Sequence, residues 1–250
     1  MRAVTEPKRE EGGLASTVRF WLSVLILVLF ARSFLFQPFH IPSGSMKATL
    51  LIGDSLMVSK YPYGYSHYSL PFSPPLFSGR ILAGQPRRGD VVVFRLPRDD
   101  SSDLIKRLIG LPGDRIQMIG GLLHINGEAV KREAIDEFVD GEDGGMGPVR
   151  RWRETLPNGV SYTTLDIMDN GPLDDTQVYV VPAGHYFMMG DNRDDSLDSR
   201  VLDEVGYIPF ENIVGRAEII YFSIGEGARA WEVWRWPSAL RWHRFFTIVR

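Results

Sequence analysis

The chain has 250 residues, of which 44% are hydrophobic and 24% charged, so it can bury a full core and is not a disordered protein. Its net charge of -3, with no long basic run, argues against a nucleic-acid-binding protein. The absence of cysteine excludes thiol catalysis, thiolate metal sites and disulfide bonds.

Residues 18–36 form the one strongly apolar segment, and residues 1–17 before it form a short polar tail. The segment is close to the roughly 20 residues that cross a bilayer core, and Arg32 near its end could extend to the headgroups. Basic residues around a short apolar stretch are also typical of a cleavable signal peptide, so composition alone leaves both possibilities open. More basic residues lie before or at the start of the span than at its end or closely after it, which predicts a cytoplasmic N-terminus. The residues compared are Arg2, Lys8, Arg9 and Arg19 against Arg32 and Lys47.

Beyond the anchor, glycine and proline separate short apolar runs, which favours strands over helices. Strands are expected at residues 55–59, 90–94, 117–119, 178–181, 186–189 and 217–222, and a hairpin at 122–130 with Asn126-Gly127 as its turn. The aromatic and proline-rich stretch within residues 56–90 suggests a protruding ribbon beside the membrane. Residues 119–180 contain no motif and are expected to form a peripheral β insertion. Residues 37–118 and 181–229 would then be the two parts of a catalytic β core.

Residues 230–250 form a tail rich in aromatic and basic side chains, including Trp231, Trp234, Trp236, Trp242, Phe245 and Phe246. Such residues favour the headgroup region of a membrane, and Pro237 argues against one continuous helix. The tail is therefore either a broken interfacial segment or an element packed on the β core. The sequence does not decide between them.

Three segments carry candidate chemistry: residues 41–46 (IPSGSM), 105–114 (IKRLIGLPGD) and 190–200 (GDNRDDSLDSR). Ser45 lies between a glycine and a methionine just beyond the anchor, which makes it a candidate nucleophile at the bilayer surface. From about residue 32 to 223 the chain resembles the bacterial type I signal peptidases, which are Ser/Lys proteases, and the three segments occur in that family's order. The resemblance implies a mainly β fold of small twisted antiparallel sheets preceded by one transmembrane helix, and it favours an uncleaved anchor.

A serine hydroxyl attacks an amide only if a neutral base removes its proton. The five histidines are scattered, and only His40 and His185 lie close to the motifs. Among the five lysines, Lys106 has the apolar neighbours best able to exclude water, and burial can lower a lysine pKa by about 3–5 units. The resemblance makes Lys106 the expected base. Lys47, close to Ser45, is the next to test.

The resemblance also implies the supporting residues. The backbone N–H of Ser45 and the hydroxyl of Ser43 would form the oxyanion hole, and Ser196 would hydrogen-bond the lysine and orient it. A structural network of ion pairs is expected in the third segment, from Asp191, Arg193, Asp198 and Arg200, with Arg107 as a further member.

An extended peptide directs alternate side chains to one side, so small residues of a precursor could enter shallow pockets beside the dyad. The candidate pocket walls are Phe39, Ile41, Met46, Leu50, Leu104 and Ile105. Ala48 stands where the family usually carries proline, and its presence is expected to loosen the backbone after the nucleophile. No metal and no other cofactor is expected, because the acidic third segment lacks the pattern of a calcium loop.

Together these features predict a membrane-anchored serine endopeptidase that removes signal peptides from exported preproteins on the outer face of the cytoplasmic membrane. Its partners would be those signal peptides and membrane lipid, with no nucleic acid. Two alternatives remain: a peptidase dedicated to one precursor, and a non-catalytic, membrane-tethered peptide-binding β protein. The presence of both Ser45 and Lys106 argues against the second.

Overall fold

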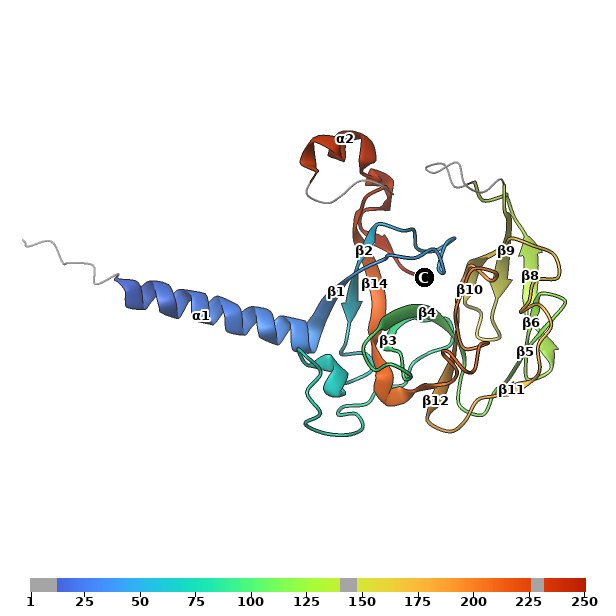
Figure 1. The fold of residues 1–250 in the computed structure, drawn as a ribbon, viewed down its shortest axis with the longest axis horizontal. Helices are drawn as coiled ribbons and strands as arrows, with labels where there is room; N and C mark the ends of the chain where they lie inside the picture. The colour runs from blue at the N-terminus through green and yellow to red at the C-terminus, as the bar shows by residue number, and fades with distance from the viewer. Residues whose placement is uncertain (1–12, 140–147, 226–231) are drawn as a thin grey trace, which may run out of the picture.

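The computed structural model describes residues 13–139, 148–225 and 232–250. The described chain begins with helix α1 (Leu14–Phe30), which continues through a π-helical turn, η1 (Ala31–Leu35), into strand β1 (Phe36–His40). The stretch Leu14–Leu35 is long and apolar enough to cross a membrane, and its α1 part, which has no buried residue, projects from the rest of the protein (Figure 1). Apolar residues lie on every face of α1, as expected for a helix surrounded by lipid rather than packed on a core. The predicted apolar helix is confirmed, although it begins at Leu14 rather than at residue 18, and its role as an anchor stays a prediction.

The main sheet has eight strands, and one of them, β4, carries Lys106. Its order is β1, β2 (Asp54–Ser59), β14 (Ile213–Ser223), β3 (Val91–Arg95), β4 (Asp103–Gly110), β12 (His185–Met189) and β13 (Ile208–Pro209), and β15 (Thr247–Ile248) also pairs with β14. All these pairs are antiparallel, and β14 changes register in its pairing with both β2 and β3. Such irregularities bend a strand, and the sheet curls so that β1 and the start of β4 line one pocket.

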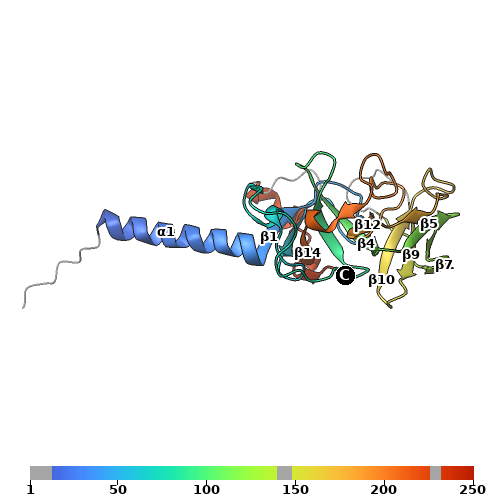
Figure 2. The same ribbon diagram turned by 90° about the horizontal axis from the view of Figure 1, so that it is seen from below.

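Two smaller sheets complete the fold at the end of the protein farthest from α1 (Figures 1 and 2). One contains β8 (Lys131–Ala134), β9 (Arg150–Thr155) and β10 (Ser161–Asp166), and the other contains β5 (Arg115–Ile119), β6 (Leu122–Ile125), β7 (Glu128–Ala129) and β11 (Tyr179–Val180). Asn126 and Gly127 both have positive φ, at 56° and 87°, and connect β6 to β7. The predicted turn is confirmed, because asparagine and glycine tolerate the left-handed conformation that a two-residue hairpin requires.

The expected β insertion does not have a hydrophobic core of its own. Ile109 of β4 and Phe187 of β12 share one buried cluster with Leu123, Leu156 and Tyr162 of the insertion. The insertion therefore packs directly on strands of the main sheet, close to the segments that carry the candidate chemistry.

The segment between β2 and β3 is mostly irregular and lies beside the end of α1 in both views (Figures 1 and 2). It contains only the short helix η2 (His67–Ser69) and an isolated bridge between Tyr65 and Ile81. The hydroxyl of Tyr65 donates a hydrogen bond of 2.9 Å to the carbonyl of Phe34, which fixes the segment to the membrane helix. The protrusion begins after Ser59 rather than at residue 56, because the side chains of β2 are part of the buried sheet.

The C-terminal tail is broken and is tied to the β core, while its contact with the membrane stays a prediction. The tail forms η4 (Val233–Arg235), α2 (Trp236–Ala239), η5 (Trp242–Arg244) and β15, so it is broken as predicted. A further short helix outside the tail, η3 (Phe210–Asn212), precedes β14. Arg244 ties the tail to the core through a 2.6 Å ion pair with Asp54. Trp234, Trp242 and Phe246 are nevertheless exposed. Ala230 and Trp231 lie outside the described residues.

Candidate active site

Ser45 and Lys106 meet at the point where the chain leaves β1 and passes the beginning of β4. Ser45 is 8% exposed and Lys106 is 3% exposed, and the lysine Nζ lies 2.6 Å from the serine Oγ in a hydrogen bond. Nζ also donates to the carbonyl of Ile105 at 3.1 Å. A helical turn from Gly44 to Leu50 presents the serine, and Met46 and Leu50, fully buried on the inner side of that turn, hold it in place.

The surroundings of Lys106 make it a base that can be neutral near physiological pH. Burial lowers the pKa of Lys106 to about 8, and the carboxylates of Asp198, Asp191 and Asp195 oppose this effect only in part. A lysine with its ordinary pKa would be almost wholly protonated at pH 7 and could not accept the serine proton.

The other basic candidates are less suited to the role. Lys47 is only partly buried, so water reaches its side chain. His40 contacts the hydroxyl of Ser55 at 3.4 Å, and His185 contacts the carbonyl of Ala183 at 2.9 Å. The geometry thus supports the lysine expected from the sequence.

Lys60 is a second buried lysine, and the sequence did not indicate that it would be buried. It is 1% exposed, and burial also lowers its pKa to about 8. Its Nζ donates to the carbonyl of Ser69 at 2.7 Å. A lowered pKa alone therefore does not identify the base, because Lys60 and Lys106 share it. The hydrogen bond between the Nζ of Lys106 and the Oγ of Ser45 identifies Lys106.

The loop after β12 holds the backbone around the nucleophile. Asn192 donates its backbone N–H to the carbonyl of Ser45 at 3.1 Å and its side-chain amide to the carbonyl of Gly44 at 3.2 Å. A Cβ at Gly190 would collide with the Oγ of Ser196 and the carbonyl of Ser45. Sequence reasoning assigned Asn192 no role; its place in the third segment was the one available signal.

The expected ion pairs form beneath this loop. Arg107 makes a bidentate contact with Asp191, at 2.8 Å from Nε and 2.7 Å from Nη2. Arg200 contacts both oxygens of Asp198 at 2.9 Å. Burial is the largest single effect and would raise the pKa of Asp198, but the charge and hydrogen bonds of Arg200, together with the hydrogen bond from the backbone N–H of Gly190, lower the pKa. Successive strand residues point to opposite faces, so β4 directs Lys106 toward Ser45 and Arg107 toward Asp191.

A further buried pair comes from the insertion, where no functional residue was expected. Glu154 of β9 binds Arg193 through two contacts, at 2.9 and 2.6 Å, and also accepts a 2.7 Å hydrogen bond from the hydroxyl of Tyr162. The guanidinium of Arg107 lies 4.2 Å from the centre of the Tyr162 ring. The insertion therefore supports the loop beside the dyad. Nothing in the local sequence of Glu154 distinguishes it from an exposed strand residue.

The two expected supporting serines are placed differently. The Oγ of Ser43 lies 3.5 Å from the Oγ of Ser45, so Ser43 is near enough for a role at the oxyanion hole, which stays a prediction. The Oγ of Ser196 is buried without a hydrogen-bond partner among the described residues. The expected hydrogen bond from Ser196 to Lys106 is not formed here, because Nζ bonds to Ser45 and to the carbonyl of Ile105.

A small pocket of about 80 Å³ lies beside Lys106, and it contains four of the six expected wall residues: Phe39, Ile41, Leu104 and Ile105. The prediction that Met46 and Leu50 form pocket walls is wrong, because both side chains have no exposed surface and pack in a buried cluster. From Asp103 to Lys106, β4 pairs only with β3, since its pairing with β12 begins at Arg107. This leaves one edge of β4 open for an added strand next to the pocket.

The backbone at Ala48 differs from the expectation that alanine only loosens this segment. Its φ is +90°, whereas proline holds φ near -65°. The turn after Ser45 thus has a conformation that a proline at this position would exclude, and that is strained for any residue with a Cβ.

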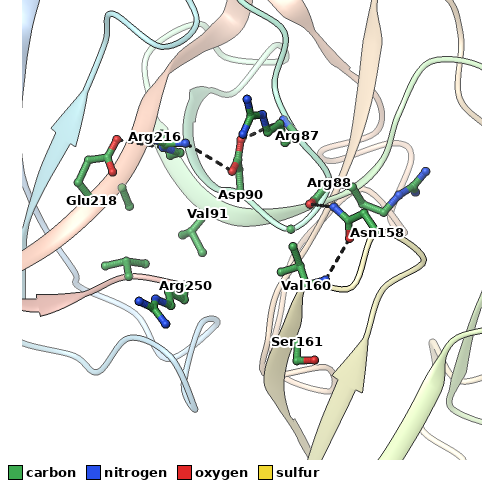
Figure 3. Close-up of a pocket in the computed structure, with 13 residues that line it drawn as sticks. Arg87, Arg88, Asp90, Val91, Asn158, Val160, Ser161, Arg216, Glu218 and Arg250 are labelled. Atoms are coloured by element: carbon green, nitrogen blue, oxygen red, sulfur yellow. Dashed lines mark hydrogen bonds and ion pairs between the residues drawn. The ribbon is translucent and has the colours of Figure 1, made fainter.

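A larger hollow, of about 610 Å³, lies elsewhere, between β3, β14 and the β9–β10 hairpin (Figure 3). Arg216, one of its four arginines, lies 2.9 Å from Glu218 and 3.9 Å from Asp90. Ser161, on its wall, contacts the hydroxyl of Thr155 at 2.8 Å, and no lysine lines the hollow. It offers no counterpart to the Ser45–Lys106 pair.

Comparison with known proteins gives consistent matches. Residues 14–222 match the family described as "Signal peptidase, peptidase S26". Signal peptidase I of Rickettsia typhi (strain ATCC VR-144 / Wilmington) is 47% identical over 208 residues, covering 80% of this chain and 77% of the relative. Signal peptidase I of Rickettsia prowazekii (strain Madrid E) is 45% identical over 224 residues, covering 86% and 80%. A crystal structure of a signal peptidase I from Enterococcus faecalis V583 matches 53% of this chain and 96% of its own at 26% identity, with a TM-score of 0.31, too low to support an argument about the fold.

Proposed function

The chain belongs to the signal peptidase family, peptidase S26, and we propose that it removes signal peptides from exported preproteins with Ser45 as nucleophile and Lys106 as general base. One observation carries the assignment of roles: the buried Nζ of Lys106 lies 2.6 Å from the Oγ of Ser45. A nucleophile and its base within hydrogen-bond reach are the basic requirement of this chemistry.

The reaction runs in two halves. Neutral Lys106 takes the proton of Ser45 as Oγ attacks the scissile carbonyl carbon, and it then gives that proton to the leaving amine as the peptide bond breaks. Lys106 next takes a proton from water, whose oxygen attacks the acyl-enzyme, and the proton returns to Ser45 as the ester bond breaks. The backbone N–H of Ser45 and the hydroxyl of Ser43 stabilise the oxyanion, and a donor of this kind is worth roughly 3–4 kcal/mol.

The precursor binds as an extended strand along the open edge of β4, next to the pocket of Phe39, Ile41, Leu104 and Ile105. A pocket of about 80 Å³ accepts only small side chains. Helix α1 crosses the cytoplasmic membrane with its N-terminus in the cytoplasm, which places Ser45 on the outer side, where exported precursors emerge.

The test uses full-length protein in detergent with a panel of unrelated precursors, and the N-terminus of each product is mapped. Ser45→Ala and Lys106→Ala are expected to abolish cleavage and leave the fold intact, since residues that act as one unit fail together. Lys131→Ala, at an exposed lysine of β8, is the matched control and should retain activity. Cleavage by a folded Lys106→Ala protein would refute the dyad, and Lys47 would then be the next base to test.

The same panel separates the alternatives. Cleavage of many unrelated precursors supports a general peptidase, whereas cleavage of one precursor supports a dedicated enzyme. Binding of precursors without any cleavage by the unaltered protein would favour a peptide-binding protein and refute the proposal.

A further inference from the structure

A polar hollow of about 550 Å³ lies where the end of the membrane helix meets the β domain. It is separate from the Ser45–Lys106 contact, although Asp103 lines both this hollow and the small pocket beside Lys106. Its walls come from η1, β1, β3, the start of β4 and the irregular segment that Figures 1 and 2 show beside the end of α1. The mechanism above uses none of its charged residues.

Two cations in this hollow, Lys60 and Arg32, form no ion pair with any described residue. Lys60 is almost completely buried, and among the described residues its Nζ makes one hydrogen bond, to the carbonyl of Ser69 at 2.7 Å. Arg32 is exposed and makes no hydrogen bond or ion pair with any described residue. Burial, and then the positive charge of Arg32, lowers the pKa of Lys60, while Asp103 offsets part of this effect. A buried ammonium with unused N–H donors beside a second cation favours the binding of an anion.

The acidic residues of the hollow already have partners. Asp103 forms a 3.0 Å ion pair with Arg95, and Asp100 accepts a hydrogen bond from the hydroxyl of Tyr68. Arg95 and Asp103 therefore offset each other, while Asp100 keeps its charge, so that the three cations Arg32, Lys60 and Arg95 outweigh the two carboxylates and the hollow is net positive.

The rim of the hollow indicates what kind of anion fits. Leu70, Pro71 and Phe72 form one side of it, and the side chain of Phe72 is fully exposed. Leu76 and Leu82 of the same segment are also largely exposed. Apolar side chains and cations that line the same hollow, beside the end of α1, provide contacts for acyl chains and for a headgroup.

We propose that this hollow binds the phosphodiester of an anionic phospholipid through Lys60 and Arg32, with the acyl chains against Phe72 and the end of α1. The lipid would join the catalytic domain to the bilayer at a second point beside the helix. This inference depends on the helix being in a membrane, and not on the roles of Ser45 and Lys106.

The test measures lipid retained by the full-length protein after transfer from detergent containing equal amounts of phosphatidylglycerol and phosphatidylcholine with identical acyl chains, by native mass spectrometry. The unaltered protein should retain phosphatidylglycerol preferentially. Because a cation near anionic lipid contributes about 1 kcal/mol, Arg32→Gln and Lys60→Met should each reduce that preference about fivefold. Arg115→Gln is the matched control, since Arg115 is exposed on β5, far from α1 (Figure 1), and it should retain the full preference.

Several results would overturn the proposal. One is equal retention of the two lipids by the unaltered protein. Another is an unchanged preference for phosphatidylglycerol in the Arg32→Gln protein. That variant changes an exposed residue, so it should fold even if Lys60→Met does not. Displacement of phosphatidylglycerol by inorganic phosphate at equal concentration would assign the site to a free phosphate. If Arg32→Gln and Lys60→Met keep the lipid preference but lose cleavage of precursors that carry acidic residues before the cut, the hollow is a substrate subsite and the proposal is wrong.

Discussion

Replacing Lys106 by methionine should abolish cleavage and make the protein more stable. The pKa of Lys106 falls from 10.5 to about 8 on folding, and each pH unit corresponds to about 1.36 kcal/mol, so the buried charge costs about 3 kcal/mol at pH 7. Methionine fills a similar volume without a charge, and loss of the hydrogen bond to Ser45 returns about 1 kcal/mol. The net gain is about 2 kcal/mol, or about 4–8 °C in Tm for a domain of this size.

The gain should depend on pH in a definite direction. Below pH 8 the lysine is charged in both the folded and the unfolded protein, so the full cost is present and methionine has its largest advantage. Between pH 8 and 10.5 the folded protein has a neutral lysine while the unfolded chain still binds the proton, so the unaltered protein gains stability as pH rises. The advantage of Lys106→Met should therefore shrink across this range and disappear.

The assay is thermal unfolding of full-length protein in detergent at pH 7 and at pH 10, followed by near-ultraviolet circular dichroism. Ser45→Ala is the control, because it should be equally inactive but should lack the gain in stability. A Lys106→Met protein that is no more stable at pH 7, or whose advantage is the same at both values, would show that Lys106 does not pay a desolvation cost on folding.

Three further changes test the surroundings of the dyad. Asp195→Asn removes an exposed carboxylate that raises the pKa of Lys106, so the rise of activity with pH should shift to lower pH, whereas Asp203→Asn, also exposed, should leave the profile unchanged. Ala48→Gly should stabilise the protein by about 1 kcal/mol in denaturant titrations, because glycine adopts a φ of +90° without strain. Ala48→Pro should destabilise it, because proline cannot adopt this φ, and the opposite order of stabilities would contradict this backbone conformation. Glu154→Gln leaves a buried guanidinium without its counter-charge and should cost about 3–5 kcal/mol; a loss below 1 kcal/mol would mean that water already compensates this pair.

The sequence by itself determined the features that depend on local pattern. The apolar stretch predicted the helix, and Asn126-Gly127 predicted its turn. Short apolar runs between glycines and prolines predicted strands such as β2, β3, β12 and β14. Each of these predictions rests on the conformational preferences of neighbouring residues. Ser45 and Lys106 were also recognised from their local motifs, and the structure brings them within 2.6 Å across 61 residues of sequence.

Only the tertiary structure decided which side chains are buried and what they meet. Met46 and Leu50 are equally apolar whether they line a pocket or fill a core, and the turn after Ser45 directs them inward. Glu154 became part of the support for the site because β9 packs against the loop that carries Arg193, 39 residues away. Burial and the choice of partner depend on segments that are distant in the chain, and a local pattern of residue types does not carry that information.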